Sequence, residues 1–302
     1  MFMGLFKPVG IGDRDRISRR LDIFHDNEAS EYTFTNLFIW GAAEHIECME
    51  TDDFLLIRSH PKGVLHYLMA FAQDESLEEA LNTAVANAKE EGLRFSMHSM
   101  PLWYCDKIRV IMPDRFVFAR ESRLDDYVYT SEDLINLRGK KLQSKRNHIN
   151  RFMSIYGRRY EYKPYTIDMA DDCMSIYNEW MSVHDISDEL LGERDSVWRA
   201  LYHADELAIV GGVILVDGKP EAFSMGERLT DDMAVIHIEK ANPRIPELFS
   251  LINRDFVSHE FSDLQWINRE EDMGNEGLKR AKESYHPARM IEKYQAVLKE
   301  DS

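Results

Sequence analysis

One acidic residue stands in an apolar stretch of the second half of the sequence. The segment Ala234–Lys240 (Ala-Val-Ile-His-Ile-Glu-Lys) reads as a strand, and Glu239 is its acid. A buried carboxylate must be paired or protonated, because desolvating a free charge is costly. Lys240 cannot be its partner, since adjacent strand residues point to opposite faces. Glu239 is thus a candidate general base toward a hydroxyl or amine, with a structural ion pair to Arg269 or Lys282 as the alternative.

A second polar group follows a short predicted strand. Asn268–Asp272 lies at the strand's end, where the sites of α/β proteins commonly gather, and a helix with glycines at its entry comes next. We expect Asp272 to be a second candidate base and Lys282 to stabilise an oxyanion or hold a terminal phosphate. Lys279 would point the same way as Lys282. The alternative is that Asp272 caps the helix and both lysines are solvated.

A basic segment interrupts an otherwise acidic chain. Between Leu134 and Tyr160 there is no Asp or Glu, but eight of the 37 basic residues. The segment predicts a helix over 139–156 with Lys141, Lys145 and His148 on one face. Such a face would bind phosphates of RNA or of an anionic lipid, and the candidate contacts are Lys141, Lys145, Arg146 and Asn147. The alternative is a solvated face between two domains.

The order of predicted elements defines the fold class. The first half reads as mixed α/β. The second half reads as a strand, two helices, a three-strand meander, then helix, strand, helix and strand. The meander covers 207–216, 221–229 and 234–240, and the later elements cover 246–260, 265–268, 275–284 and 289–298. We therefore predict two α/β domains, 14–135 and 136–302, with the basic helix at their junction.

Composition excludes several classes of protein. A formal charge of −17 argues against a protein coated in nucleic acid. No stretch approaches the roughly 20 apolar residues that a membrane span needs. The cysteines Cys48, Cys105 and Cys173 lie far apart, without disulfide or zinc-site spacing. We expect a cytoplasmic protein that holds no metal.

The second half resembles the N-acetyltransferase-like (GNAT) fold. In that fold the fourth strand and the helix after it splay from the next strand, and an acyl carrier binds in the gap. The fourth strand here would contain Glu239, and the following helix could hold a phosphate at its start. Acetyl-CoA enzymes usually have a glycine-rich loop there, whereas this sequence has Asn242–Pro246 (Asn-Pro-Arg-Ile-Pro). The fold class is therefore α/β (α+β), with tandem GNAT-like domains.

Three blocks carry a narrower resemblance, which spans most of residues 20–297. They are Leu137–Phe152, His237–Ala241 and Asn268–Pro287. Together they resemble the soluble C-terminal domain of the phosphatidylglycerol lysyltransferase family, a tandem GNAT-like domain related to Fem-type aminoacyltransferases. Members of these families move an aminoacyl group from tRNA to a lipid hydroxyl or a peptidoglycan amine. We expect the protein to lack the membrane domain of the lysyltransferases, which would be a departure from that family.

The resemblance implies an acyltransferase-type protein, with three readings left open. The first transfers an aminoacyl group from aminoacyl-tRNA to a lipid headgroup, an amine or a small molecule. The second is an acyl-CoA-dependent N-acyltransferase, and the third is a non-catalytic binding module. The residues identify no bound cofactor, so aminoacyl-tRNA or acyl-CoA would be a co-substrate. Further candidate substrate or carrier contacts are His237, Lys240, Asn242, Arg269, Lys279 and Tyr285.

The fold order also predicts where the candidate residues meet. The strand that holds Glu239 would lie beside the strand that ends at Asn268, and the helix that carries Lys282 would return over the same edge. We therefore expect Glu239, Arg269, Asp272 and Lys282 to converge on one cleft.

Overall fold

The computed structural model describes residues 5–299, apart from the side chain of Lys62. The chain divides into two compact units. The first joins the segment up to Asp126 to the segment from Ile291 onward, and the second is Tyr127–Met290. The sequence had suggested a boundary at 135/136 and a C-terminal segment in the second domain. The difference arises because the last strand returns to the sheet of the first unit, where it pairs with two strands.

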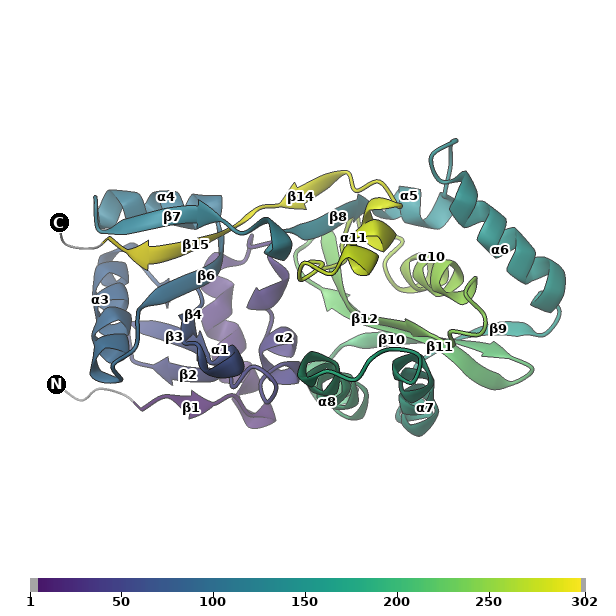
Figure 1. The fold of residues 1–302 in the computed structure, drawn as a ribbon, viewed down its shortest axis with the longest axis horizontal. Coiled ribbons are helices and arrows are strands. Elements are labelled where there is room, and N and C mark those ends of the chain that lie inside the picture. Colours follow the sequence, from purple (N-terminus) through teal and green to yellow (C-terminus); the bar gives the residue numbers. More distant parts are fainter. Residues whose placement is uncertain (1–4, 300–302) are drawn as a thin grey trace. The chain divides into compact units, whose positions relative to one another are not determined.

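The first unit is built on a mixed sheet in the order β1-β2-β3-β4-β6-β15-β7, with β5 paired to β3 (Figure 1). Its strands are β1 (Lys7–Pro8), β2 (Glu47–Glu50), β3 (Phe54–Ser59), β4 (His66–Tyr67), β5 (Phe71–Ala72), β6 (Ser96–Pro101), β7 (Phe116–Arg120) and β15 (Lys293–Leu298). Its helices are α1 (Arg14–Leu21), α2 (Phe34–Ile39), α3 (Asp74–Glu90) and α4 (Leu102–Ile111). The apolar positions of α3 recur at helical spacing and are buried.

The second unit has a sheet in the order β14-β8-β13-β12-β11-β10-β9. Its strands are β8 (Asp126–Thr130), β9 (Tyr160–Pro164), β10 (Val210–Val216), β11 (Lys219–Arg228), β12 (Met233–Ala241), β13 (Trp266–Asn268) and β14 (Arg289–Ile291). The meander β10-β11-β12 is antiparallel, whereas β12 and β13 are parallel. A parallel pair needs a crossover, which α10 supplies.

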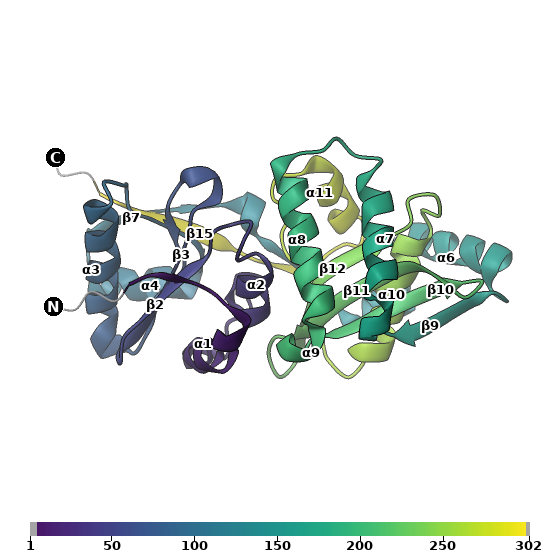
Figure 2. The same cartoon turned by 90° about the horizontal axis from the view of Figure 1, so that it is seen from below.

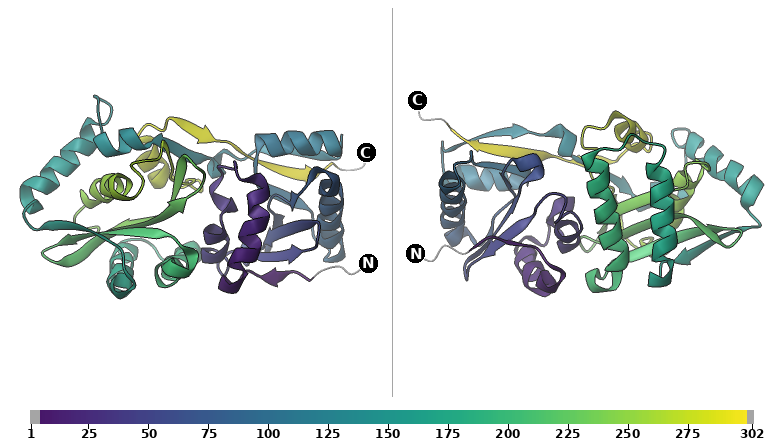
Figure 3. Two further views of the ribbon diagram at one scale, coloured as in Figure 1. Left: turned by 180° about the vertical axis from the view of Figure 1, so that it is seen from behind. Right: turned by 60° about the horizontal axis from the view of Figure 1, so that its bottom comes forward.

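Helices cover both faces of the second unit's sheet. They are α5 (Ser131–Asn136), α6 (Gln143–Tyr156), α7 (Ala170–Met181), α8 (Asp188–Tyr202), α9 (Ala204–Leu207), α10 (Leu248–Glu260) and α11 (Glu276–Glu283). Figures 1 and 2 place α7 and α8 on one face and α10 on the other. Figure 3 shows α7 and α8 side by side. On the α10 face a buried apolar core joins α5, α6 and α10 to the sheet, through residues such as Leu134, Phe152, Ile236, Leu251 and Phe256.

Strand β12 diverges from β13 and carries a bulge. The two strands pair only from Met233↔Trp266 to Val235↔Asn268, so the later part of β12 runs past the end of β13. The register against β11 shifts between Met225 and Gly226, which leaves His237 as the extra residue. A bulge changes which residues face each side of a sheet. Ile236 therefore joins the α10 core before the bulge, and Glu239 points to α10 after it.

The basic helix is shorter than predicted at its start. Helix α6 begins at Gln143 rather than near Gly139, and it ends at Tyr156 with Gly157 as its cap. Lys141 therefore lies in the turn before the helix and does not share a helical face with Lys145 and His148. The predicted final strand 289–298 is likewise two strands, β14 and β15.

Candidate functional site

Glu239 lies in a buried ion pair on the α10 face of β12. Its carboxylate accepts hydrogen bonds at 2.9 Å from Arg269 Nη2 and at 2.9 Å from Asn253 Nδ2, one on each oxygen. The side chains of Glu239 and Arg269 are only 14% and 11% exposed. Arg269 directly follows β13, and Asn253 lies on α10. The pair thus lies where β12 and β13 diverge. This geometry is the one predicted as the alternative, in which Glu239 forms a structural ion pair with Arg269.

Aromatic rings and a second cation complete this group. The Arg269 guanidinium lies over the rings of Tyr285 and Tyr129, at 4.8 and 5.5 Å from their centroids. The ammonium of Lys145, on α6, lies 4.0 Å from the centroid of the Tyr285 ring. Both contacts have cation–π geometry. We call Lys145, Glu239, Asn253, Arg269 and Tyr285 the Glu239 cluster.

The charges within the Glu239 cluster alter its protonation. Burial, together with the neighbouring Arg269 charge, lowers the pKa of Lys145 to about 8, although the Glu239 carboxylate opposes this shift. Burial raises the pKa of Tyr285, which the Arg269 charge and a hydrogen bond with Ser250 oppose. A lysine with this pKa can exchange a proton near physiological pH.

Two atoms of the Glu239 cluster are buried without a hydrogen-bond partner among the described residues. They are Nη1 of Arg269, a donor, and Oδ1 of Asn253, an acceptor. Buried polar atoms are normally satisfied, so these two atoms could each bond a polar group of a ligand that reaches them. The two atoms set opposite requirements, since the ligand must offer an acceptor to Arg269 and a donor to Asn253.

Asp272 and Lys282 organise the loop that carries Arg269. Asp272 accepts hydrogen bonds from the Tyr127 hydroxyl and the Gly274 amide, both at 2.7 Å. Lys282 donates to the backbone carbonyls of Arg269, at 2.6 Å, and Glu271. The backbone here is unusual, because Glu270 and Met273 have positive φ angles of 57° and 53°.

The predicted convergence on Glu239 is therefore corrected in part. The structure brings Arg269 to Glu239. Asp272 and Lys282 instead stabilise the loop 269–274, which carries Arg269, through the contacts described above. Asn275, rather than Asp272, caps helix α11, through bonds to the amides of Gly277 and Leu278. Lys279 is half-buried on that helix, three residues before Lys282.

His237 is buried between two carboxylates. Its Nδ1 lies 2.8 Å from Glu270 and its Nε2 lies 3.0 Å from Glu227. Burial alone would lower the pKa of His237, but the hydrogen bonds and charges of the two carboxylates outweigh it and raise the pKa to about 10. An imidazolium ion with both nitrogens bonded joins the bulge of β12 to β11 and to the Arg269 loop. This geometry describes a structural contact, and a substrate contact of His237 stays a prediction.

Lys240 and Asn242 lie away from the Glu239 carboxylate. The Lys240 ammonium bonds Glu193 of α8 at 2.8 Å and lies 3.6 Å from the centroid of a Trp180 ring, on the α7 and α8 side of the sheet. The opposite orientation of Glu239 and Lys240 is the one that strand geometry requires. Asn242 bonds Glu221 at 2.6 Å and the amide of Arg244 at 3.0 Å, so it orders the turn that enters α10.

The predicted phosphate contacts of the basic segment divide into two kinds. Lys141 and Asn147 are exposed. Arg146 is half-buried and donates to the carbonyls of Leu137 and Gly139, while Lys145 belongs to the Glu239 cluster. Within residues 5–299 no carboxylate lies in salt-bridge distance of Lys141, Lys145 or Arg146. The segment therefore retains unneutralised positive charge.

Sequence reasoning missed three residues around Glu239. Asn253 and Ser250 lie on the buried face of α10, and Tyr129 lies in β8. Two polar residues in the apolar stripe of a helix are a signal that the sequence did contain, because buried polar side chains need partners. Tyr129 carried no such signal, since a tyrosine in a strand is ordinary.

The second unit thus combines a diverging strand pair, a crossover helix and a buried polar cluster at the divergence. The whole chain has two α/β units, and it is an acyltransferase-type protein of tandem GNAT-like fold. The chain belongs to the family described as phosphatidylglycerol lysyltransferase, C-terminal, whose model matches residues 24–297.

Solved structures agree with this assignment. A conserved protein of unknown function from Bacteroides thetaiotaomicron is 34% identical, with a TM-score of 0.89 over 98% of this chain and 100% of that chain. L-PGS from Bacillus licheniformis is 14% identical, with a TM-score of 0.64 over 96% and 93%. A tandem GNAT protein from the clavulanic acid biosynthesis pathway is 9% identical, with a TM-score of 0.50 over 99% of each chain. The last two show the fold alone. No curated protein matches the sequence.

The described part of the chain contains neither a helix that could span a membrane nor a cluster that could hold a metal ion. None of its helices has the length and apolar character that would let it cross a membrane. None of its groupings of His, Cys, Asp and Glu has the arrangement of a metal site. The three cysteines in that part are buried free thiols.

Proposed function

We propose that this protein transfers an aminoacyl group from aminoacyl-tRNA to a hydroxyl or amine acceptor, with the Glu239 cluster as its active site. The observation that carries the proposal is the pair of unpartnered buried atoms on either side of Glu239. Membership in the lysyltransferase family supports the choice of an aminoacyl group over other acyl groups.

An aminoacyl ester meets both requirements of the unpartnered atoms. Its carbonyl oxygen can accept from Arg269 Nη1, and its α-ammonium, one carbon away, can donate to Asn253 Oδ1. A simple acetyl group offers the carbonyl but no donor. The site therefore favours an acyl group that carries an amine next to its carbonyl.

The reaction needs one proton acceptor and one group to stabilise the oxyanion. The acceptor's oxygen or nitrogen attacks the ester carbonyl and its proton passes to Glu239, which acts as the base. The negative charge that develops on the carbonyl oxygen is stabilised by Arg269, with Lys145 as a second cation. The ester bond to the ribose then breaks, and the proton returns to the ribose oxygen. The products are the aminoacylated acceptor and uncharged tRNA.

Asp272 and Lys282 act in this proposal through Arg269. Their contacts fix the loop 269–274, which sets the position of the guanidinium toward Glu239. They are positioning residues, whereas the sequence had suggested a base and a charge stabiliser. The exposed cations of the basic segment supply the attraction to the RNA backbone.

The acyl-CoA reading gains less support from the geometry. A carrier pyrophosphate would need free amides at the start of α10. The amides of Arg244, Ile245 and Leu248 are instead bonded to internal oxygens. The turn Asn242–Pro246 also has prolines where acetyl-CoA enzymes usually have a glycine-rich loop. We therefore treat acetyl-CoA as the comparison donor in the experiment below.

Transfer can be measured directly with bulk tRNA charged with labelled amino acids. The acceptors, in separate reactions, are phosphatidylglycerol vesicles and a peptide amine, and acetyl-CoA replaces the tRNA in a parallel series. We expect Glu239→Gln to lower transfer at least about a hundredfold, since the amide keeps the shape but cannot accept the proton. Glu276→Gln, an exposed glutamate of α11, is the matched control and should retain activity.

The outcomes separate the three readings. Label transfer from tRNA that requires Glu239 supports the proposal. Transfer from acetyl-CoA alone would replace it with the N-acyltransferase reading. Tight binding of aminoacyl-tRNA with no turnover, changed only in affinity by Glu239→Gln, would favour the binding module.

A further inference from the structure

Lys145 is the member of the Glu239 cluster that belongs to the basic segment. Helix α6 carries it to the ring of Tyr285, and its ammonium lies 4.0 Å from the centroid of that ring. The Arg269 guanidinium lies 4.8 Å from the same centroid and is bonded to Glu239. Two cations thus share one aromatic ring. Lys145 connects the segment that would attract RNA to the carboxylate proposed as the base.

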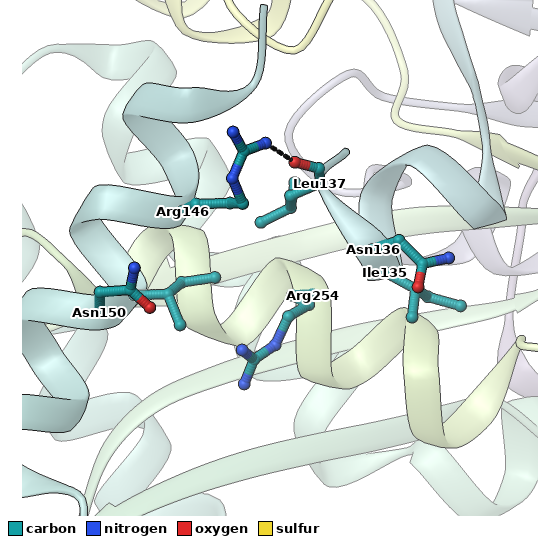
Figure 4. Close-up of a pocket in the computed structure, with 7 residues that line it drawn as sticks. Ile135, Asn136, Leu137, Arg146, Asn150 and Arg254 are labelled. Atoms are coloured by element: carbon teal, nitrogen blue, oxygen red, sulfur yellow. Dashed lines mark hydrogen bonds between the residues drawn. The ribbon is translucent and has the colours of Figure 1, made fainter. Parts of the chain in front are cut away.

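The next residue of α6, Arg146, serves a different group. Figure 4 shows its side chain directed toward Leu137, whose carbonyl it bonds, and it also donates to the carbonyl of Gly139 at 2.7 Å. Successive residues of a helix are about 100° apart around its axis, so the two neighbouring cations point in different directions. Arg146 therefore orders the turn before α6, while Lys145 is directed to the Glu239 cluster.

The ammonium of Lys145 has unused hydrogen-bonding capacity. A lysine ammonium has three N–H donors. Among residues 5–299 this ammonium has neither a hydrogen bond nor an ion pair, and its contact is with an aromatic face. Lys145 is half-buried, whereas the side chain of Arg269 is only 11% exposed. Lys145 can therefore reach both a substrate at the cluster and the solvent.

The ribose of a bound aminoacyl-tRNA would approach the cluster from the side of α6. Its ester joins the aminoacyl carbonyl to the ribose, and the phosphates beyond that ribose would contact exposed cations such as Lys141. The carbonyl oxygen and the ribose oxygen are bonded to the same carbon atom. A carbonyl oxygen held by Arg269 therefore places the ribose oxygen toward the neighbouring cation on the RNA side, which is Lys145.

We propose that Lys145 is the general acid that protonates the leaving ribose oxygen. As the C–O bond of the ester breaks, its electron pair goes to the ribose oxygen, and Lys145 donates a proton to that oxygen and becomes a neutral amine. Glu239 holds the proton taken from the acceptor. Glu239 then releases this proton to solvent and Lys145 regains one, which balances the cycle. The inference rests on the proposed function and deepens it by identifying the proton donor.

The protonation chemistry of the cluster supports this role. A guanidinium does not lose its proton in proteins, so Arg269 can stabilise charge but cannot act as an acid. Burial raises the pKa of Tyr285. Burial and the Arg269 charge lower the pKa of Lys145 to about 8, so its amine can lose and regain a proton in each cycle. Glu239, which opposes that shift, lies across the cluster, and His148 follows three residues later on α6.

The test compares two leaving groups that carry the same amino acid. One donor is aminoacyl-tRNA, whose ribose hydroxyl leaves as a strong base unless it is protonated. The other is an N-acetylcysteamine thioester, whose thiol has a pKa of about 8.5 and can leave without an acid. The acceptor is the phosphatidylglycerol vesicle or the peptide amine, whichever supports transfer by the wild type.

Lys145→Arg keeps the positive charge but cannot release the proton. We expect this variant to lower transfer from tRNA about a hundredfold, within the usual contribution of a general acid, and to transfer from the thioester about as fast as the wild type. Lys89→Arg makes the same replacement at an exposed position of α3 and is the matched control, with both rates unchanged.

A second variant controls for folding and packing. Lys145→Cys should also lose transfer from tRNA and should regain it after the introduced thiol is alkylated with 2-bromoethylamine, which restores an amine of similar length. The three native cysteines are buried, so the same treatment should leave the wild type unchanged. Recovery would show that the amine itself is required.

Several results would overturn the inference. Transfer from tRNA by Lys145→Arg at the wild-type rate would leave Lys145 as a cation only. An equal loss with both donors would assign it to the fold or to the oxyanion, and so would a lack of recovery after alkylation. Transfer that requires Glu239 but not Lys145 refutes the general acid alone. Absence of transfer in the wild type, or transfer unchanged by Glu239→Gln, refutes the proposed function and the inference with it.

Discussion

Glu239 and Arg269 are 30 residues apart in the sequence and form a buried ion pair at 2.9 Å where β12 and β13 diverge. One partner belongs to a strand and the other to the loop after its parallel neighbour. The pair therefore exists only if the strands separate after Val235 and the bulge turns Glu239 toward α10. The same geometry brings Asn253 and Lys145 to the pair, so one feature of the sheet organises the cluster.

We predict that the Glu239–Arg269 pair is strongly coupled in stability. Arg269→Met should lower the free energy of unfolding by about 3 kcal/mol, because it leaves a carboxylate buried without its cation. The double variant Glu239→Gln/Arg269→Met should lose less than the sum of the single variants. Urea unfolding of the four proteins measures the coupling. Additive losses would show that the two side chains do not interact.

The sequence predicted the fold better than the site. The meander β10-β11-β12 and the helix after it follow from apolar runs separated by tight turns such as Asp217–Lys219, and these signals are local. The unit boundary could not be predicted in the same way. Whether β15 pairs within the second unit or with β6 depends on contacts between segments almost 200 residues apart, for which the pattern of a short strand contains no information.

For the candidate site, the sequence limited the possible partners of Glu239 but did not identify which residue is the partner. It required a buried Glu239 to be paired or protonated and excluded Lys240 as the partner, since both conclusions need only burial and strand alternation. It could not choose between Arg269 and Lys282. That choice depends on the loop 269–274, where two residues have positive φ angles. Lys145 was assigned to phosphate binding from the charge and helical spacing of its segment, which contain no information on the packing that brings it to Tyr285.

We predict that Lys145 titrates with a midpoint near pH 8. Its pKa is lowered to about 8 by burial and by the Arg269 charge, and the Glu239 carboxylate opposes the shift. Glu239→Gln should therefore lower the midpoint further, and Arg269→Met should raise it. The measurement is a ¹³C NMR titration of reductively methylated protein, with the Lys145 signal assigned by its loss in Lys145→Arg. Midpoints that move in the opposite directions would contradict the described arrangement.

We predict that His237 stabilises the fold at acidic and neutral pH and not at strongly alkaline pH. Its pKa is about 10 in the folded protein, above the unfolded value of about 6.5, so the folded state binds the proton more tightly. The stabilisation is complete below pH 6.5 and disappears as the pH rises through 10. The difference in unfolding free energy between wild type and His237→Gln should therefore shrink from pH 6 to pH 10. A difference that is constant over this range would show that His237 is neutral.

We predict that Gly226 is required for the bulge that orients Glu239. An added Cβ at this position would lie 2.4 Å from the backbone oxygen of Val235, on the paired strand β12, and backbone cannot move aside as a flexible side chain can. Gly226→Ala should therefore cost about 2 kcal/mol, the usual range for overpacking. It should also speed hydrogen exchange of the β12 amides around His237. Gly12→Ala is the control, because a Cβ there meets nothing within 4 Å, and it should change stability by less than about 1 kcal/mol. If Gly226→Ala unfolds like the wild type and leaves exchange unchanged, the bulge does not depend on this glycine.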